Sequence, residues 1–146
     1  LPKLLSSMVV GPNTLCHGDY RADNLLFNEN NEPVAIDFQL LGTGTGAYDI
    51  AYFVTQSLTP EVASKHERDL FDQWVTALIA HGAQAGLVDR EALWLHYRTA
   101  ALFCLAYPVI ASRGMDLSDP RQRTLIEVMT NRFDRAVREL NLAELL

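Results

Sequence analysis

Apolar residues recur every three or four positions through most of the chain beyond residue 47, which is the spacing of amphipathic helices. A first helix is predicted over 47–57. A second begins at Thr59-Pro60, because a threonine caps free backbone N–H groups and proline is tolerated at the first helical position. Its pattern ends near the glycines of 82–86, where glycine favours chain reversal.

Two more helices are predicted in the last third of the chain. Asp89 opens one of them, and Pro108 should kink it, since proline removes one backbone donor. Asp119-Pro120 opens the last, and nothing beyond Ala47 has the alternation of a strand. The predicted apolar face of the last helix comprises Leu125, Ile126, Met129, Phe133, Ala136, Val137 and Leu140.

The pattern is different before residue 47. Residues 1–10 have helical spacing, and Thr14-Leu15-Cys16 is a short extended segment. Two short apolar runs, 25–27 and 33–36, flank a polar turn and should pair as a hairpin. The glycines of 42–46 predict a flexible loop. The sequence therefore predicts one domain over 1–146, of the α+β class and mainly α, with a short β-hairpin followed by about four helices.

Composition excludes several classes of function. The formal charge of −6 argues against a nucleic-acid partner, which needs clustered Lys and Arg. The longest apolar run, 99–112, is too short to span a membrane, and no signal peptide is recognisable. Cys16 and Cys104 lie in separate apolar runs, as buried thiols of a reducing compartment do. We therefore expect a cytoplasmic protein without a membrane partner.

Several polar residues lie between the extended residues 14–16 and the predicted hairpin, and another follows the hairpin. Asp19 and Asn24 are five residues apart, and Asp37 follows the second predicted strand, with Arg21 close to Asp19. Phosphoryl transfer to an alcohol needs a carboxylate for the hydroxyl proton, oxygen ligands for Mg²⁺ and a cation for the transferred group. Magnesium prefers oxygen and takes only one or two protein carboxylates. These residues supply that set.

The motif itself resembles a known superfamily. His17-Gly18-Asp19-Tyr20-Arg21-Ala22-Asp23-Asn24, followed by Ile36-Asp37-Phe38-Gln39, is similar to the aminoglycoside phosphotransferase and choline kinase group of the protein-kinase-like fold. With Gly46-Ala47-Tyr48-Asp49-Ile50-Ala51, it looks closest to the ecdysteroid-kinase-like small-molecule kinases. The specific resemblance covers about 17–53. It implies a protein-kinase-like C-terminal lobe whose hairpin carries the catalytic and metal loops.

The resemblance also implies a role for each residue. Asp19 would be the catalytic base, and Arg21 would contact the transferred phosphate. Asn24 and Asp37 would hold Mg²⁺ and, through it, ATP as co-substrate. The implied partner is a small molecule with a hydroxyl group. His17 would brace the loop, and Asp49 would tie the loop to the helix behind it. Gln39 stands where protein kinases carry a glycine.

Each assignment has a simpler alternative. Asp19, Asp23 and Asn24 are common turn residues, although the full spacing with Asp37 favours a site. Arg21 is equally compatible with a surface ion pair. Residues 42–47 also satisfy the dinucleotide fingerprint G-x-G-x-x-G/A, but no second parallel strand follows. The aromatic residues Trp94, Tyr97, Phe103 and Tyr107 are expected in the core, with a substrate pocket as the alternative, and Glu61, Glu67, Asp69 and Asp72 are expected on solvated helix faces.

One part of a kinase is not recognisable in the sequence. The nucleotide lobe needs a glycine-rich phosphate loop and a strand lysine, and the chain has only Lys3 and Lys65, both in helical patterns. The first residue is Leu1 and not Met. We therefore expect the C-terminal lobe of a larger enzyme, inactive alone, whose N-terminal lobe is a missing partner. The alternative is a catalytically inactive, kinase-like binding or scaffold domain.

Overall fold

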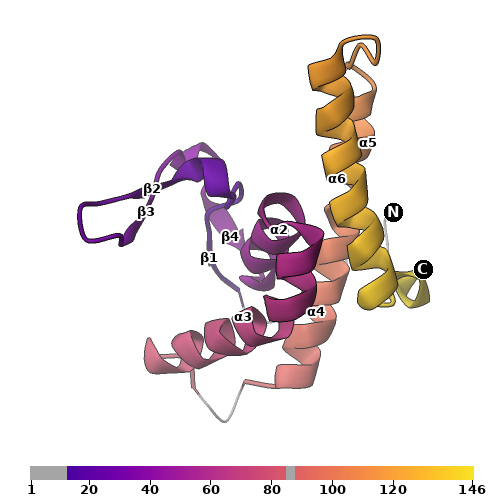
Figure 1. Cartoon of the computed structure of the whole chain (residues 1–146). Coiled ribbons are helices and arrows are strands. Elements are labelled where there is room, and N and C mark those ends of the chain that lie inside the picture. Colours follow the sequence, from indigo (N-terminus) through magenta and orange to yellow (C-terminus); the bar gives the residue numbers. More distant parts are fainter. Residues whose placement is uncertain (1–12, 85–87) are drawn as a thin grey trace.

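The computed structural model describes residues 13–84 and 88–146, and within them the chain is a mainly helical α+β domain (Figure 1). The helix predicted over 1–10 lies outside the described residues. Two antiparallel strand pairs precede the helices, and η marks a short 3₁₀ turn. The elements are β1 Thr14–Cys16, η1 Ala22–Asn24, β2 Leu25–Phe27, β3 Pro33–Ala35, η2 Phe38–Leu40, β4 Gly42–Gly44, α2 Ala47–Ser57, α3 Pro60–Ala80, α4 Arg90–Phe103, α5 Ala106–Ser112, α6 Pro120–Glu139 and η4 Leu142–Leu145.

Three helices begin at the capping residues that the sequence predicts. The Thr59 hydroxyl accepts a hydrogen bond from the Val62 N–H at the start of α3. Asp89 caps α4 through two backbone N–H groups, and Asp119 caps α6. A side-chain oxygen that satisfies otherwise free N–H groups stabilises a helix start by about 1 kcal/mol. The predicted starts of these helices are confirmed because they depend on local chemistry.

The strand region confirms one prediction and corrects another. β2 pairs with β3 as the predicted hairpin, with Leu26 opposite Val34. The segment Gly42–Gly44, predicted as a flexible loop, is instead the strand β4, which pairs antiparallel with β1. Backbone pairing needs no particular side chains, so a strand of Gly-Thr-Gly gives no apolar alternation for a sequence pattern to detect.

The helix predicted from Asp89 past Pro108 is two helices. α4 ends at Phe103 and α5 begins at Ala106, so the break lies close to Cys104. A proline ring clashes with the carbonyl four residues earlier and provides no N–H for it. The Cys104 carbonyl instead accepts a hydrogen bond from the Tyr107 N–H at 3.1 Å. The predicted effect of Pro108 is thus present, and it breaks the helix four residues before the proline.

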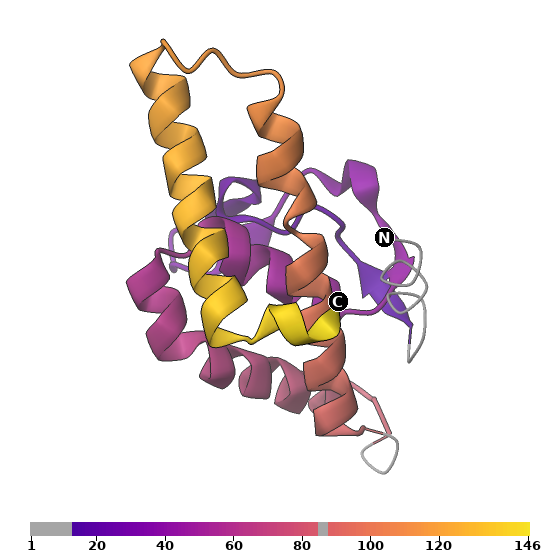
Figure 2. The same cartoon turned by 90° about the vertical axis from the view of Figure 1, so that its right-hand side faces the viewer.

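The core lies where α2, α3, α4 and the end of α6 meet, and it includes the fully buried Phe71, Val75 and Tyr97. α5 and the first part of α6 rise beside each other away from this core (Figures 1 and 2). The predicted apolar face of α6 is therefore buried only at its end, at Phe133, Ala136 and Leu140. Leu125 is 50% exposed because no helix of the core lies beneath it.

A buried ion pair corrects the prediction for Glu67. This side chain was expected on a solvated face, but the residue is only 6% exposed and pairs with Arg135 of α6. The Tyr97 hydroxyl also donates a hydrogen bond to Glu67 Oε1 at 2.6 Å. Both partners come from other helices, so the spacing of α3 alone could not reveal them.

Two further expectations concern cysteines and membranes. Cys16 and Cys104 are both free and buried, as predicted. None of the helices in the described residues is long and apolar enough to cross a bilayer.

Candidate functional site

The candidate site begins in the loop between β1 and η1, and its shape depends on Gly18. Gly18 has φ +85°, and a Cβ there would lie 2.5 Å from the Leu40 carbonyl oxygen. That backbone region and that close approach are both open only to glycine at low energy. Steric constraints therefore explain why glycine stands between His17 and Asp19.

Asp49 in the first turn of α2 holds this loop from behind. Its two carboxylate oxygens accept hydrogen bonds from the His17 N–H at 2.7 Å and the Gly18 N–H at 3.0 Å. His17 Nε2 donates to the Ile36 carbonyl at 2.8 Å, and Nδ1 accepts from the Asp19 N–H at 3.3 Å. Because both ring nitrogens are engaged, His17 is placed to support the loop rather than to exchange protons with a ligand.

Asp19 receives its closest contacts from Asn24. The Asn24 amide nitrogen donates to Asp19 Oδ2 at 2.9 Å and to the Asp19 carbonyl at 2.8 Å. Arg21 Nε lies 3.4 Å from Asp19 Oδ1, and its Nη1 lies 3.4 Å from Asp23. The ion-pair alternative for Arg21 is therefore present, and Asp23 sits in the turn η1 with its side chain exposed.

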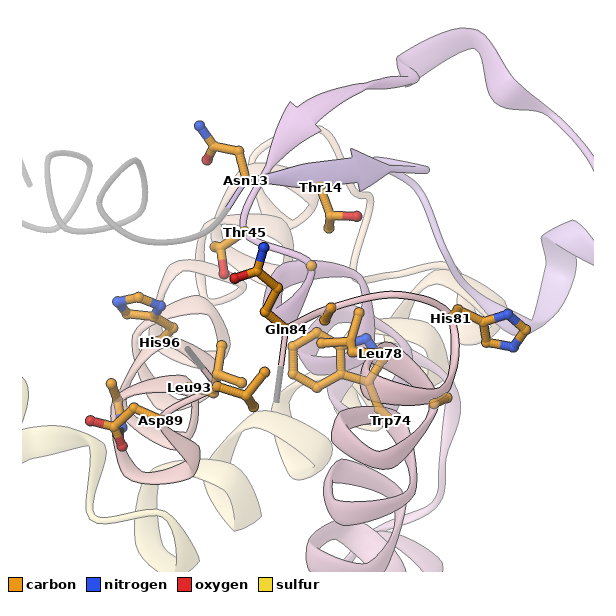
Figure 3. Close-up of a pocket in the computed structure, with 15 residues that line it drawn as sticks. Asn13, Thr14, Thr45, Trp74, Leu78, His81, Gln84, Asp89, Leu93 and His96 are labelled. Carbon is orange, nitrogen blue, oxygen red and sulfur yellow. Dashed lines mark hydrogen bonds between the residues drawn. The ribbon is translucent and has the colours of Figure 1, made fainter. Parts of the chain in front are cut away.

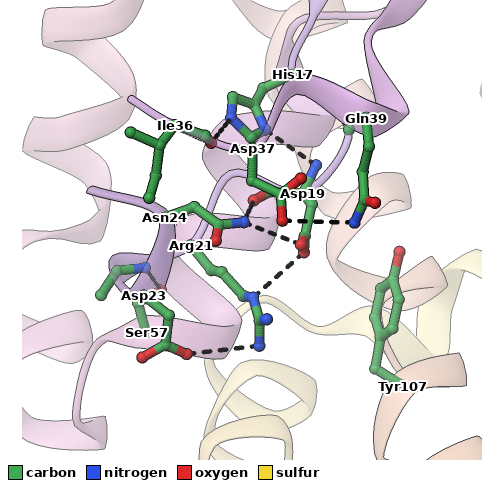
Figure 4. A network of polar contacts seen from close by, with 12 residues as sticks. His17, Asp19, Arg21, Asp23, Asn24, Ile36, Asp37, Gln39, Ser57 and Tyr107 are labelled. Carbon is green, nitrogen blue, oxygen red and sulfur yellow. Dashed lines mark hydrogen bonds and ion pairs between the residues drawn. The ribbon is translucent and has the colours of Figure 1, made fainter. Parts of the chain in front are cut away.

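Asp37 is brought to this loop by the residue before it. The Ile36 N–H donates to the Asn24 carbonyl at 2.9 Å, while the Ile36 carbonyl holds the ring of His17. Figure 4 shows the side chains of Asp19, Asn24 and Asp37 in this network. Asp37 has φ +63°, a left-handed conformation uncommon outside glycine, and such strain is often found at functional positions.

The donor atoms of this group suit Mg²⁺. Because the amide nitrogen of Asn24 donates to Asp19, the amide oxygen of Asn24 is left available as a metal ligand. Asp37 is exposed, and its carboxylate has one long contact, 3.4 Å from Gln39 Nε2. In the described part of the chain no three His, Cys, Asp or Glu side chains form a metal cluster. A site of one carboxylate and one amide still fits magnesium, which keeps several waters and binds phosphate oxygens.

A group of three tyrosines that contacts the loop at Gly18 is a feature that the motif did not reveal. Tyr48 and Tyr52 come from α2, and Tyr107 comes from α5. Tyr107 was predicted for the core or a substrate pocket, and its hydroxyl is hydrogen-bonded to the hydroxyl of Tyr48. Burial and then the Asp19 carboxylate raise the pKa of Tyr52. Two of the three lie at i and i+4 on α2, which is the one signal that the sequence contained.

An apolar cavity lies elsewhere, between the C-terminal end of α3, the start of α4 and the strand pair β1–β4 (Figure 3). It has a volume of about 880 Å³ and an apolar wall that includes Trp74 and Leu93. Thr45 and His96 line this cavity, and their buried Oγ1 and Nδ1 atoms have no hydrogen-bond partner among the described residues. Its one carboxylate among the described lining residues, Asp89, caps α4. The described lining of this cavity therefore offers no free carboxylate for phosphoryl transfer.

Two comparisons with known proteins bear on this site. The model of the Ecdysteroid kinase-like family matches residues 5–87, more than half of the chain, a range that contains every site residue from His17 to Asp49. The chain is also 37% identical over 54 residues to a Mycoplasma pneumoniae (strain ATCC 29342 / M129 / Subtype 1) protein named "Uncharacterized protein MG356 homolog". That alignment covers 37% of this chain and 19% of the relative.

Proposed function

The chain belongs to the ecdysteroid kinase-like family, and we propose that it carries the base and metal ligands of a small-molecule kinase. The proposed reaction transfers the γ-phosphoryl group of ATP to a hydroxyl of a small organic molecule. One observation carries the proposal. The Asn24 amide bonds the Asp19 carboxylate, and the Ile36 backbone joins Asp37 to the same loop.

In this proposal Asp19 receives the proton of the substrate hydroxyl. The substrate oxygen forms a bond to the γ-phosphorus, and the bond from that phosphorus to the β–γ bridging oxygen breaks, so ADP leaves with the electron pair. A carboxylate within hydrogen-bond reach of the hydroxyl contributes about 10²–10⁴-fold to such a step. Asn24 contributes by holding the carboxylate in place.

Asn24 and Asp37 are the residues proposed to hold magnesium. When bound, Mg²⁺ would neutralise charge on the phosphate oxygens. Arg21 is 45% exposed and pairs weakly with Asp19 and Asp23, so it can turn towards the transferred phosphate at little cost. The pairing keeps its positive charge beside the base.

A complete enzyme also needs a loop over the phosphates and a lysine that pairs with them. Lys65 is exposed on α3, on a helix and not on a strand. We therefore propose that a separate nucleotide-binding lobe supplies both groups and that the 146-residue chain alone does not turn over ATP. The two free, buried thiols agree with a reducing compartment, and we propose the cytoplasm.

The test uses a protein in which this chain is joined to such a lobe. It is incubated with Mg²⁺ and [γ-³²P]ATP and with a panel of neutral, cationic and polycyclic alcohols, and phosphorylated products are separated and counted. We expect label in at least one alcohol and none with the 146-residue chain alone. Binding of Mg²⁺-ATP without transfer to any alcohol or to water would support the scaffold alternative.

A further inference from the structure

Three side chains on one face of α2 follow the site loop that joins β1 to η1. Asp49, Phe53 and Ser57 are spaced by four residues, so they project from the same face of the helix. Asp49 holds the Gly18 N–H near the start of the loop, and the Phe53 ring lies 5.7 Å, between centroids, from the Tyr20 ring. Ser57 contacts the far end of the loop. The loop therefore runs along α2 from the first turn of the helix to its last residue.

The contact made by Ser57 is a hydrogen bond at the start of η1. The Ser57 hydroxyl accepts it from the Ala22 N–H at 2.9 Å (Figure 4). The first N–H groups of a helical turn have no partner within the turn, and Arg21, which precedes η1, supplies no side-chain cap. Ser57 therefore caps, from 35 positions further along the chain, the turn that contains Asn24.

Ser57 is itself held in place by α6. The guanidinium of Arg132 donates to the Ser57 carbonyl at 3.0 Å and also to the Gln56 carbonyl. Both carbonyls lie at the C-terminal end of α2, where the last carbonyls of a helix have no partner within it. The end of α2 is thus fixed to a second long helix, which supports the position from which the Ser57 hydroxyl meets η1.

We propose that Ser57 is a positioning residue for the kinase reaction and acts through η1 on Asn24. The inference rests on the proposed function, in which Asn24 holds Mg²⁺ and orients the Asp19 carboxylate. The Asn24 backbone N–H bonds the Arg21 carbonyl within the turn at 2.9 Å, and its side-chain amide bonds Asp19 Oδ2 at 2.9 Å. A shift at the first residue of this three-residue turn therefore moves the Asn24 side chain relative to Asp19.

The hydroxyl of Ser57 differs from other hydroxyls on the helices, which serve their own helix. Those hydroxyls donate to a carbonyl three or four residues earlier, as serine and threonine commonly do within a helix, and they belong to Thr55, Ser64, Thr76, Thr99, Ser112 and Thr124. The Ser57 hydroxyl instead accepts a bond from a distant turn. Alanine is the better helix former, so helix formation alone does not explain a serine at this position.

The first experiment needs no activity. In the 146-residue chain, hydrogen exchange of the Ala22 amide and the side-chain amide resonances of Asn24 are followed by NMR in Ser57→Ala. Loss of one hydrogen bond should speed exchange of the Ala22 amide about fivefold, and the Asn24 resonances should move. Ser57→Thr keeps the hydroxyl and should leave both unchanged. Ser112→Ala is the matched control, because the Ser112 hydroxyl bonds a carbonyl of its own helix.

The second experiment titrates Mg²⁺ in ATP hydrolysis, with water as acceptor, by a protein that joins this chain to the proposed nucleotide lobe. Ser57→Ala should raise the Mg²⁺ concentration for the half-maximal rate about tenfold, because a displaced Asn24 holds the metal less well. The KM for ATP at saturating Mg²⁺ should stay within about twofold. Ser57→Thr should restore the titration of the unmodified protein, whereas a merely structural role would lower the melting temperature without moving the magnesium titration.

The two experiments separate failure of the inference from failure of the proposed function. Asn24 resonances that do not move in Ser57→Ala would overturn the inference, and so would moved resonances with an unchanged magnesium titration. Resonances that move equally in Ser112→Ala would overturn it as well. If the unmodified protein hydrolyses no ATP, the proposed function fails, and the resonances alone then decide whether Ser57 sets the position of Asn24.

Discussion

Two arginine–carboxylate pairs in this chain have similar partners and opposite surroundings. Glu67 and Arg135 pair between α3 and α6, with side chains only 7% and 5% exposed, and the Tyr97 hydroxyl completes the group. Asp19 and Arg21 pair within the loop after β1, with side chains 15% and 45% exposed, and the Asn24 amide completes the group.

The two pairs differ in whether one partner can leave the other without destabilising the fold. Removing one partner of a buried pair leaves an uncompensated charge in the core, so Glu67 and Arg135 must stay together. Burial, and then the charge of Glu67, raise the pKa of Tyr97 well above its usual range, which keeps that donor protonated. The Arg21 side chain is 45% exposed and lies 3.4 Å from Asp19, so in the proposed reaction Arg21 can leave Asp19 at little cost when a ligand arrives. The first pair suits structure and the second suits chemistry.

Asp19→Asn should show the largest difference between loss of activity and loss of stability. In a protein that joins this chain to the proposed nucleotide lobe, we expect phosphoryl transfer to fall about 10²–10⁴-fold because the proton acceptor is lost. Its melting temperature should change little, since an amide of the same size keeps the packing of the loop. Calorimetry and ³²P transfer on the same preparation measure both. Near-normal transfer would refute the role of Asp19 as base.

Arg135→Ala should do the reverse. Leaving Glu67 unpaired in the core should lower the free energy of unfolding by about 3–5 kcal/mol in urea denaturation. Arg138→Ala is the matched control, because Arg138 pairs with Asp134 in the same helix but on the exposed surface. We expect at most about 1 kcal/mol for the control. Equal losses of unfolding free energy in Arg135→Ala and Arg138→Ala would contradict the contrast between buried and exposed ion pairs.

Cys16 directly precedes the site loop, so the reactivity of its thiol tests whether burial extends up to that loop. Burial, and then the charge of Asp49, raise the pKa of its thiol from 9.0 to about 11. At pH 8 this lowers the thiolate fraction about a hundredfold, and a thiol-disulfide reagent should react with the native chain at least about a hundredfold more slowly than with the urea-unfolded chain.

The raised pKa of Cys16 also predicts that the fold becomes less stable at alkaline pH. The unfolded chain loses the Cys16 proton near pH 9 and the folded chain only near pH 11, so the unfolded state binds fewer protons between these values. The contribution of Cys16 to the free energy of unfolding is therefore complete below pH 9 and decreases as the pH rises towards 11. Cys16→Ala should remove this part of the pH dependence in urea titrations at pH 8 to 11, and an unchanged slope would contradict the assignment.

Asp37→Asn should have the smallest effect of the four substitutions. We expect the Mg²⁺ concentration for half-maximal transfer to rise by about 10-fold or more, because one anionic ligand is replaced by a neutral one. Asp23→Asn is the control, since Asp23 pairs with Arg21 on the exposed side of the turn. A magnesium titration that is the same for Asp37→Asn and the unmodified protein would refute Asp37 as a ligand.

Local chemistry explains what the sequence by itself determined. The starts of α3, α4 and α6 follow from Thr59, Asp89 and Asp119, whose side chains bond N–H groups only two or three residues away. The hairpin follows from apolar runs on either side of a polar turn. The resemblance to ecdysteroid kinase-like proteins is confirmed because it depends on residue types at fixed spacings, which a sequence states directly.

Contacts between distant segments were decided only by the tertiary structure. β4 is a strand because β1 offers a backbone partner, and Glu67 is buried because Arg135 and Tyr97 reach it from α6 and α4. Tyr107 of α5 reaches Tyr48 of α2 from beyond the break at Cys104, a contact that no spacing in the sequence reveals. Long-range pairing has no periodicity along the chain, so the sequence could state which groups a site contains but not which groups hold them in place.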